Sequence, residues 1–169
     1  MNTTSTTDLP SEEELKERAA DLIRSQSTMT LATALENKAW AAPVYYVDID
    51  FLFYFFSSPS SRHILEALES KTASAAVFHP SDKWKDIQGI QMSGSIKPVG
   101  PGWEAAKALR AYLRKFPFTG DFFGKKKILD LQDFSKTFRV KLYRFRPTRL
   151  LYMDNRIQFG FRAEIPLSP

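Results

Sequence analysis

Residues 51–63 read FLFYFFSSPSSRH. The first six are apolar and mostly aromatic, a composition typical of a β-strand that is covered on both faces. A serine-rich turn follows, and Ile64, Leu65 and Leu68 then recur at helical spacing. This spacing predicts a helix over about 61–70 with those three side chains on its buried face. The stretch thus predicts a strand, a turn and a helix in direct succession.

The residues before this stretch predict an antiparallel arrangement. Residues 28–35 and 40–47 have strand character on either side of a polar break, which favours a hairpin. An amphipathic helix is expected over about 11–26, because Ser11 and Glu14 have the spacing of a capping box. With the aromatic strand, three strands follow one another over short connections. We therefore expect a meander.

The residues after the stretch continue the pattern. Residues 72–79 and 87–99 predict two strands, the second with a bulge or bend at Gly89 or Gly94. A further helix is expected from Pro101 to Phe116-Pro117. Its expected buried side is formed by Trp103, Ala106, Leu109 and Leu113.

The carboxyl-terminal part is harder to interpret. Residues 119–135 are ambiguous, whereas 138–142 alternate as in a strand, and Asp154-Asn155 separate 150–152 from 157–159 as a hairpin would. Together the patterns predict an α+β fold: a closed or nearly closed antiparallel barrel of six or seven strands with two to four flanking helices. Residues 1–10 are expected to be a disordered tail, and 11–169 a single domain.

Composition excludes several kinds of chemistry. The 169 residues include no Cys and only two His, so thiolate nucleophiles, iron–sulfur clusters, Cys-containing zinc sites and three-His metal sites are ruled out. We expect no bound metal. The longest apolar run, 51–56, is far shorter than the ~20 residues of a spanning helix, and the first residues do not form a signal peptide. A cytoplasmic protein without a membrane partner is therefore the default expectation.

Charge is distributed unevenly along the chain. Residues 1–96 carry 8 basic and 13 acidic side chains, and 97–169 carry 16 basic and 6 acidic ones. A basic half is compatible with a nucleic-acid partner bound through its cationic residues Arg139, Lys141, Arg144, Arg146 and Arg149. No recognised nucleic-acid module accompanies the charge, which favours a mixed, solvated surface.

The motif search leaves one positive signal. Neither a dinucleotide-binding glycine motif nor a P-loop occurs, and Ser61 with His63 lacks the acid and oxyanion hole of a hydrolytic triad, so no catalytic residue is assigned. In contrast, serine hydroxyls, an Arg and the amides at a helix start can together bind a phosphate. The alternative is that Ser60 or Ser61 only caps the helix while Arg62 is exposed.

The order of these segments resembles the pyridoxamine 5′-phosphate oxidase-like family of FMN-binding split barrels. The shared features are a small-residue strand, a strand containing PVYY, the aromatic strand, the SRH turn and the segment WKDIQGIQMSG. Residues 116–118 (FPF) and the stretch from Asp154-Asn155 to Gly160-Phe161 are similar to the family's small YhbP-like bacterial members. The resemblance covers 28–99 well and 100–162 more loosely.

This resemblance implies a set of cofactor-binding residues. The phosphate motif falls on Ser61, Arg62 and His63, and the aromatic-hydroxyl pair before it on Phe56 and Ser57. The strand along the flavin ring falls on Ala42, Pro43, Val44 and Tyr45. A flavin-facing glutamine falls on Gln88 or Gln91, between which the sequence does not choose.

The residues expected to bind substrate differ from those of vitamin B6 oxidases. Cationic residues of that enzyme are replaced here by Ala42, Val47 and Phe116, and His63 replaces a Lys. The resemblance therefore implies a flavin-dependent oxidoreductase of unknown substrate and electron partner, a homodimer with FMN at the interface, and no vitamin B6 oxidation. Candidate walls for an apolar substrate are Phe116, Phe118, Phe159 and Phe161, for which core or dimer packing is the alternative. A non-catalytic flavin or haem carrier on the same barrel remains the second hypothesis.

Overall fold

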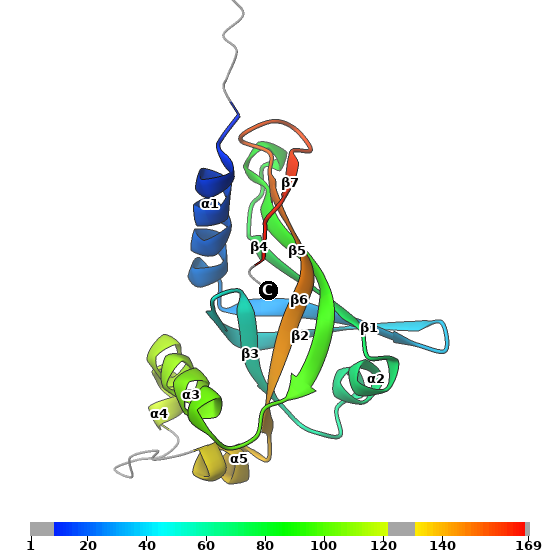
Figure 1. The fold of residues 1–169 in the computed structure, drawn as a ribbon, viewed down its shortest axis with the longest axis vertical. Coiled ribbons are helices and arrows are strands. Elements are labelled where there is room, and N and C mark those ends of the chain that lie inside the picture. Colours follow the sequence, from blue (N-terminus) through cyan, green and yellow to red (C-terminus); the bar gives the residue numbers. More distant parts are fainter. Residues whose placement is uncertain (1–8, 122–130, 168–169) are drawn as a thin grey trace, which may run out of the picture.

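The computed structural model describes residues 9–121 and 131–167. Its strands are β1 Thr28–Leu35, β2 Lys38–Ile49, β3 Leu52–Ser57, β4 Ala73–His79, β5 Gln88–Pro98, β6 Lys141–Asp154 and β7 Arg162–Glu164. They form one antiparallel sheet in the order β3-β2-β1-β4-β5-β6-β7, and a pairing of β3 with β6 closes six of them into a barrel (Figure 1). The predicted α+β antiparallel barrel is confirmed.

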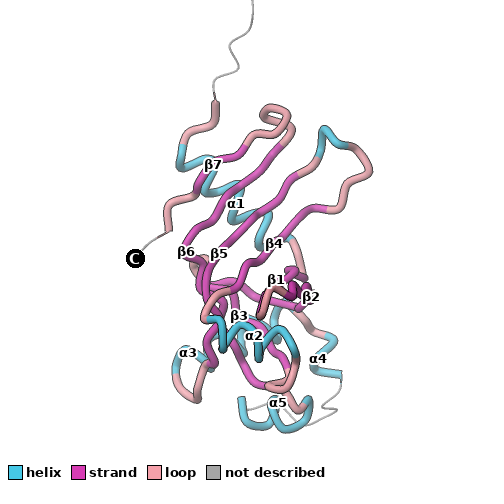
Figure 2. The backbone as a smooth tube through the Cα atoms, turned by 90° about the vertical axis from the view of Figure 1, so that its right-hand side faces the viewer, coloured by secondary structure: helices cyan, strands magenta, loops and turns pink. Residues whose placement is uncertain are grey.

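The helices lie around this barrel. They are α1 Glu12–Ser25, α2 Arg62–Ser70, α3 Trp103–Lys115, the single turn α4 Phe118–Asp121 and α5 Leu131–Phe138, with a 3-10 turn at Trp84–Asp86. In both views α3, α4 and α5 gather at one end of the long axis, away from the β6–β7 connection (Figures 1 and 2). The expected tail, 1–10, falls mostly outside the described residues.

The aromatic strand supplies two cores at once. Phe53 and Phe55 belong to the cluster inside the barrel, whereas Tyr54 belongs to a second cluster between the outer face of the sheet, α3 and α5. Because consecutive residues of a strand point to opposite faces, β3 is covered on both sides, as its composition predicted.

The start of α1 follows the sequence prediction closely. The backbone amide of Glu14 donates to Ser11 Oγ at 3.2 Å, and the amide of Ser11 donates to Glu14 Oε2 at 2.7 Å. This reciprocal pair is a complete capping box. Leu15, Ala19, Leu22 and Ile23 then cover one end of the barrel core.

Two helices are rotated from the predicted orientation. Trp103 of α3 is 74% exposed, and the buried residues include Ala105 and Ala108 instead of Ala106. On α2, Leu65 and Leu68 are exposed, whereas the buried face consists of His63, Ile64, Glu66 and Ala67. The apolar spacing predicted the wrong buried face for α2, because two polar side chains of this helix are hydrogen-bonded and can therefore be buried.

The carboxyl-terminal strands also differ from expectation. Residues 138–140 are not part of a strand, because Phe138 ends α5 and β6 begins at Lys141. The hairpin after β6 exists, but its second strand is β7 and not 157–159. Those residues form turns, in which Ile157 N donates to Asp154 O and Phe161 N donates to Gln158 O. Of the ambiguous segment 119–135, residues 122–130 lie outside the described part.

Only one of the two candidate glycines carries an irregularity. The pairing of β5 with β6 shifts register between Ser93 and Gly94, whereas it is continuous through Gly89. A Cβ at Gly94 would lie 2.2 Å from the carbonyl oxygen of Arg146. The bulge therefore depends on the absence of a side chain there.

Two absences apply to residues 9–121 and 131–167. Within these ranges, no helix has the length and apolar character that a bilayer crossing requires. The same part of the chain contains no group of three acidic or histidine side chains placed to hold a metal ion.

Candidate functional site

The serine-rich turn is a closed hydrogen-bonded unit between β3 and α2. Nε2 of His63 lies 2.8 Å from Ser57 Oγ and 3.3 Å from Ser61 Oγ. Ser61 Oγ also donates to the carbonyl of Ser58, and the hydroxyls of Ser58 and Ser60 are 2.9 Å apart. The predicted phosphate hydroxyls therefore bond one another in this structure, which fixes the turn at the start of α2.

The start of α2 is not capped by a side chain. Ser61 occupies the N-cap position, but its hydroxyl accepts no hydrogen bond from a backbone amide of the helix. Its carbonyl accepts from the amides of Ile64 and Leu65. The amides of Arg62 and His63 precede these bonds and, as at any helix start, have no acceptor within the helix. Of the alternative interpretation, Ser61 does occupy the N-cap position and Arg62 is exposed, but the Ser61 hydroxyl caps no helix amide. The free amides at this helix end suit an anion.

Arg62 is held by two neighbours, Glu66 and Trp40. Its Nε donates to Glu66 Oε1 at 2.6 Å, and the other oxygen of Glu66 accepts from Thr33 Oγ1 at 2.6 Å. The guanidinium carbon lies 4.7 Å from the ring centroid of Trp40. These contacts use one of the five N–H donors of Arg62 and one face of its plane. The terminal nitrogens therefore remain for an anion.

The charges in this region are set by burial and hydrogen bonding. Burial lowers the pKa of His63, and the nearby Glu66 only partly opposes this effect. Hydrogen bonds from Thr33 and then Arg62 lower the pKa of Glu66. At neutral pH His63 is therefore neutral and Glu66 ionised. The positive charge is carried by Arg62 together with the helix dipole.

The edge of β2 next to Arg62 is open. Residues 38–45 pair with β1 on one side, and β3 pairs only with residues 46–49 on the other, so no described strand occupies the second edge of 38–45. The amide of Tyr46 bonds to Ser27 on the β1 side. Because backbone amides alternate in direction along a strand, those of Ala41 and Tyr45 point to the open edge. Pro43, which lies between them, has no backbone N–H to leave unpaired there.

An aromatic trio lies at the far end of this edge. The ring of Tyr45 lies 5.2 Å from that of Phe116 and 5.8 Å from that of Phe118, and Phe116 and Phe118 are themselves 5.8 Å apart. Tyr45 is 48% exposed and Phe118 is 46% exposed. From Trp40 to Tyr45 the strand rises by about 16 Å, at ~3.3 Å per residue. The open edge thus runs between a cationic end and an aromatic end.

A buried cation adjoins the aromatic end. Nζ of Lys115 lies 4.3 Å from the ring centroid of Tyr46 and 5.9 Å from that of Phe116. No hydrogen-bond partner for it is present among the described residues. Burial lowers the pKa of Lys115, while the charge of Asp48 opposes this shift.

The two glutamines occupy opposite faces of β5. Gln91 is exposed on the outer face, in a cross-strand row with Ala76, Thr30 and Pro43. Gln88 instead accepts from Nη2 of Arg156 at the start of the strand. Of the two, only Gln91 shares a face with Pro43, but three strand spacings, about 14 Å, separate them.

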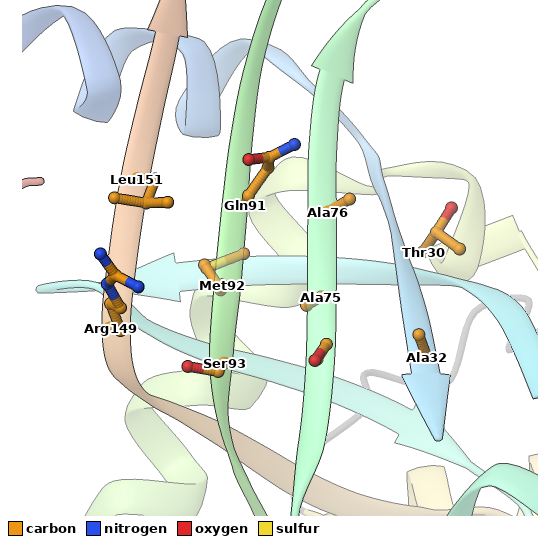
Figure 3. A pocket seen from close by; sticks show the side chains of 10 residues that line it. Thr30, Ala32, Ala75, Ala76, Gln91, Met92, Ser93, Arg149 and Leu151 are labelled. Atoms are coloured by element: carbon orange, nitrogen blue, oxygen red, sulfur yellow. The ribbon is translucent and has the colours of Figure 1, made fainter. Parts of the chain in front are cut away.

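Gln91 lines a shallow hollow of about 370 Å³ on the outer face of the sheet (Figure 3). In Figure 3 the side chains of Leu151, Gln91, Ala76 and Thr30 lie in a row across four strands. The lining residues are Thr30, Ala32, Ser74, Ala75, Ala76, Gln91, Met92, Ser93, Arg149 and Leu151. None of them is His or Tyr, and Met92, the one lining side chain of a type that can hold haem iron, is only 5% exposed.

Other predicted site residues are dispersed. Ala42 and Val44 face the barrel side of β2, opposite to Pro43 and Tyr45. Phe56 faces the second core, with its ring 4.2 Å from that of Phe134.

Phe159 and Phe161 lie in the β6–β7 connection, at the other end of the molecule from α3 and α4 (Figure 1). Phe159 contacts Trp84 there, with ring centroids 5.3 Å apart. Within one chain the four predicted substrate-wall phenylalanines therefore do not form one pocket.

Sequence reasoning missed the residues that hold Arg62. Arg62 and Glu66 have the spacing of a helical ion pair, which could have indicated their contact. Thr33 and Trp40 pair across β1 and β2, and only the fold brings them to α2. No local signal identifies them.

Comparison with known proteins supports the fold. No family model matches the sequence, and no curated protein matches it either. Solved structures do match. A haem-binding protein from Mycobacterium smegmatis has a TM-score of 0.66 and 20% identity, with 92% of this chain and 58% of that one covered. This chain thus spans little more than half of that protein's length.

Two further structures are similar over most of both chains. A FAD-binding protein from Mesorhizobium loti has a TM-score of 0.58 and 16% identity, covering 79% of this chain and 90% of its own. The haem storage protein HutZ from Vibrio cholerae has a TM-score of 0.61 and 13% identity, covering 80% and 92%. At these identities the likeness shows a shared barrel fold, which is the fold that the sequence resemblance implied.

Proposed function

We propose that this chain binds FMN along the open edge of β2. The main support is that this edge extends from the start of α2, where Arg62 lies, to the ring of Tyr45. Such an edge suits a ligand with a phosphate at one end and a planar ring at the other. The amides of Ala41 and Tyr45 would donate to the ring's polar atoms, and the trio would cover its apolar part.

The proposed activity is that of a flavin-dependent oxidoreductase on a small apolar molecule. Bound flavin supplies the hydride or electron transfer, so the protein needs no nucleophile. The residues of this chain bind and orient the ring, and the aromatic trio excludes water from one side of it. As part of the same proposal, this chain is related to the YhbP-like proteins and is located in the cytoplasm.

A homodimer is part of this proposal. The outer face of β1, β4 and β5 presents small side chains such as Ala32, Ser74 and Ala76, which allow a flat surface to approach closely. In the proposed dimer this face meets a second copy near the flavin. Sedimentation should give a dimer for the wild type and a monomer for Ala76→Arg, whereas Ala106→Arg, on the exposed side of α3, should remain dimeric.

A haem carrier is the second candidate, because two of the similar structures are named for haem. Of the two histidines, His63 is buried against Ser57, and His79 is exposed at the end of β4. Absorption spectra after separate incubation with FMN and haemin, followed by desalting, distinguish the candidates. Retained flavin absorption supports the proposal, whereas a retained Soret band with no flavin would replace it.

A further inference from the structure

We propose that Glu66 is the positioning residue of this phosphate site, because it aims the guanidinium of Arg62 at the start of α2. This inference rests on the proposed function, since it assigns a role within the same site. The residue is unusual for its place: it is a carboxylate with 7% exposure on the inner face of α2. A negative charge beside a phosphate site needs a reason.

The hydrogen bonds of Glu66 provide that reason. Oε1 accepts from Arg62 Nε and Oε2 accepts from Thr33 Oγ1, both at 2.6 Å. Thr33 is itself buried in β1, so it anchors the carboxylate to the sheet. Each oxygen therefore has one fixed partner, and the carboxylate cannot turn without losing one of them.

The same contacts fix the plane of Arg62. Binding at Nε leaves the two terminal nitrogens without a hydrogen-bond partner among the described residues, and the ring of Trp40 lies against the guanidinium at 4.7 Å. A free Arg side chain would lose rotamer entropy on binding a ligand. Here that entropy is already lost in the folded chain, so a phosphate meets a pre-oriented donor pair.

A double-mutant cycle tests this role through FMN and riboflavin, which differ only in the phosphate. Glu66→Ala should weaken FMN binding about fivefold or more, within the usual range of coupling between contacting residues. It should leave riboflavin binding unchanged. In the Arg62→Ala background, Glu66→Ala should have no further effect. The matched control is Glu69→Ala, on the exposed side of the same helix.

Glu66→Gln separates orientation from folding. The amide oxygen can still accept from Arg62 Nε, so FMN affinity should equal or exceed that of the wild type. Three results would overturn the inference: FMN affinity of Glu66→Ala that matches or exceeds the wild type, a loss that persists without Arg62, or an equal loss for riboflavin. If the wild type binds no FMN, the proposed function fails, and the inference with it.

Discussion

The rings of Tyr45 and Phe116 form a T-shaped pair at a centroid distance of 5.2 Å, and this contact joins β2 to the end of α3. Tyr45 is the outward-facing residue at the end of the open edge, and it is half exposed. The contact thus marks where a planar ligand lying along β2 would meet an aromatic wall.

Replacing Tyr45 by Ala should weaken FMN and riboflavin equally, because both have the ring. The expected loss is about 0.5–1.5 kcal/mol, the usual size of an aromatic pair interaction. Titration of flavin fluorescence measures it, and Tyr45→Phe, which keeps the ring, is the control. An effect on FMN alone would place Tyr45 near the phosphate instead.

The burial of His63 predicts a pH dependence of stability. Its pKa is lowered in the folded chain, so the unfolded chain binds a proton first as the pH falls. Stability should therefore decrease as the pH falls below about 6.5, the ordinary value for His. Thermal unfolding between pH 7.5 and about 5 measures this slope. His63→Asn should flatten it, and the exposed His79→Asn should not; an unchanged slope in His63→Asn would refute the assignment.

The bulge in β5 makes Gly94 intolerant of a side chain. Gly94→Ala places a Cβ against the carbonyl of Arg146, and the free energy of unfolding should fall by about 3 kcal/mol, at the upper end of overpacking effects. A Cβ at Gly100 meets nothing within 4 Å, so Gly100→Ala is the control. Denaturant unfolding measures both. Equal stability of the two variants would contradict this account of the bulge.

Much of the barrel could be predicted from local patterns. Residues 28–35, 40–47 and 51–56 alternate or are wholly apolar, and their short connections leave few topologies other than a meander. Ser11 and Glu14 form their capping box from residues within one helical turn, so sequence alone contains the information.

One prediction was wrong because of a long-range contact, and another because of a local turn. Glu66 is buried because Thr33 of β1, 33 residues earlier in the chain, donates a hydrogen bond to its carboxylate. Residues 157–159 do not form a strand, because Asn155 Oδ1 accepts from the amide of Gly160 and keeps the segment in turns. Thr33 lies outside any local window around Glu66, whereas Gly160 is only five residues from Asn155.

The candidate site was predictable only in part. The phosphate end depends on a contiguous turn, and Ser61, Arg62 and His63 do lie together at the start of α2. The substrate walls depend on long-range packing, and the structure joins Phe116 to Phe118 but not to Phe159.

The central claim is that this barrel binds a flavin phosphate at the start of α2. Equilibrium titration of the wild type and Arg62→Ala with FMN and with riboflavin tests it most directly. We predict that the wild type binds FMN more tightly than riboflavin, and that Arg62→Ala weakens FMN by about 1–3 kcal/mol, as for a lost charge-assisted contact, while riboflavin is unaffected. Equal affinity of the wild type for the two flavins, or FMN binding that does not depend on Arg62, would contradict the account.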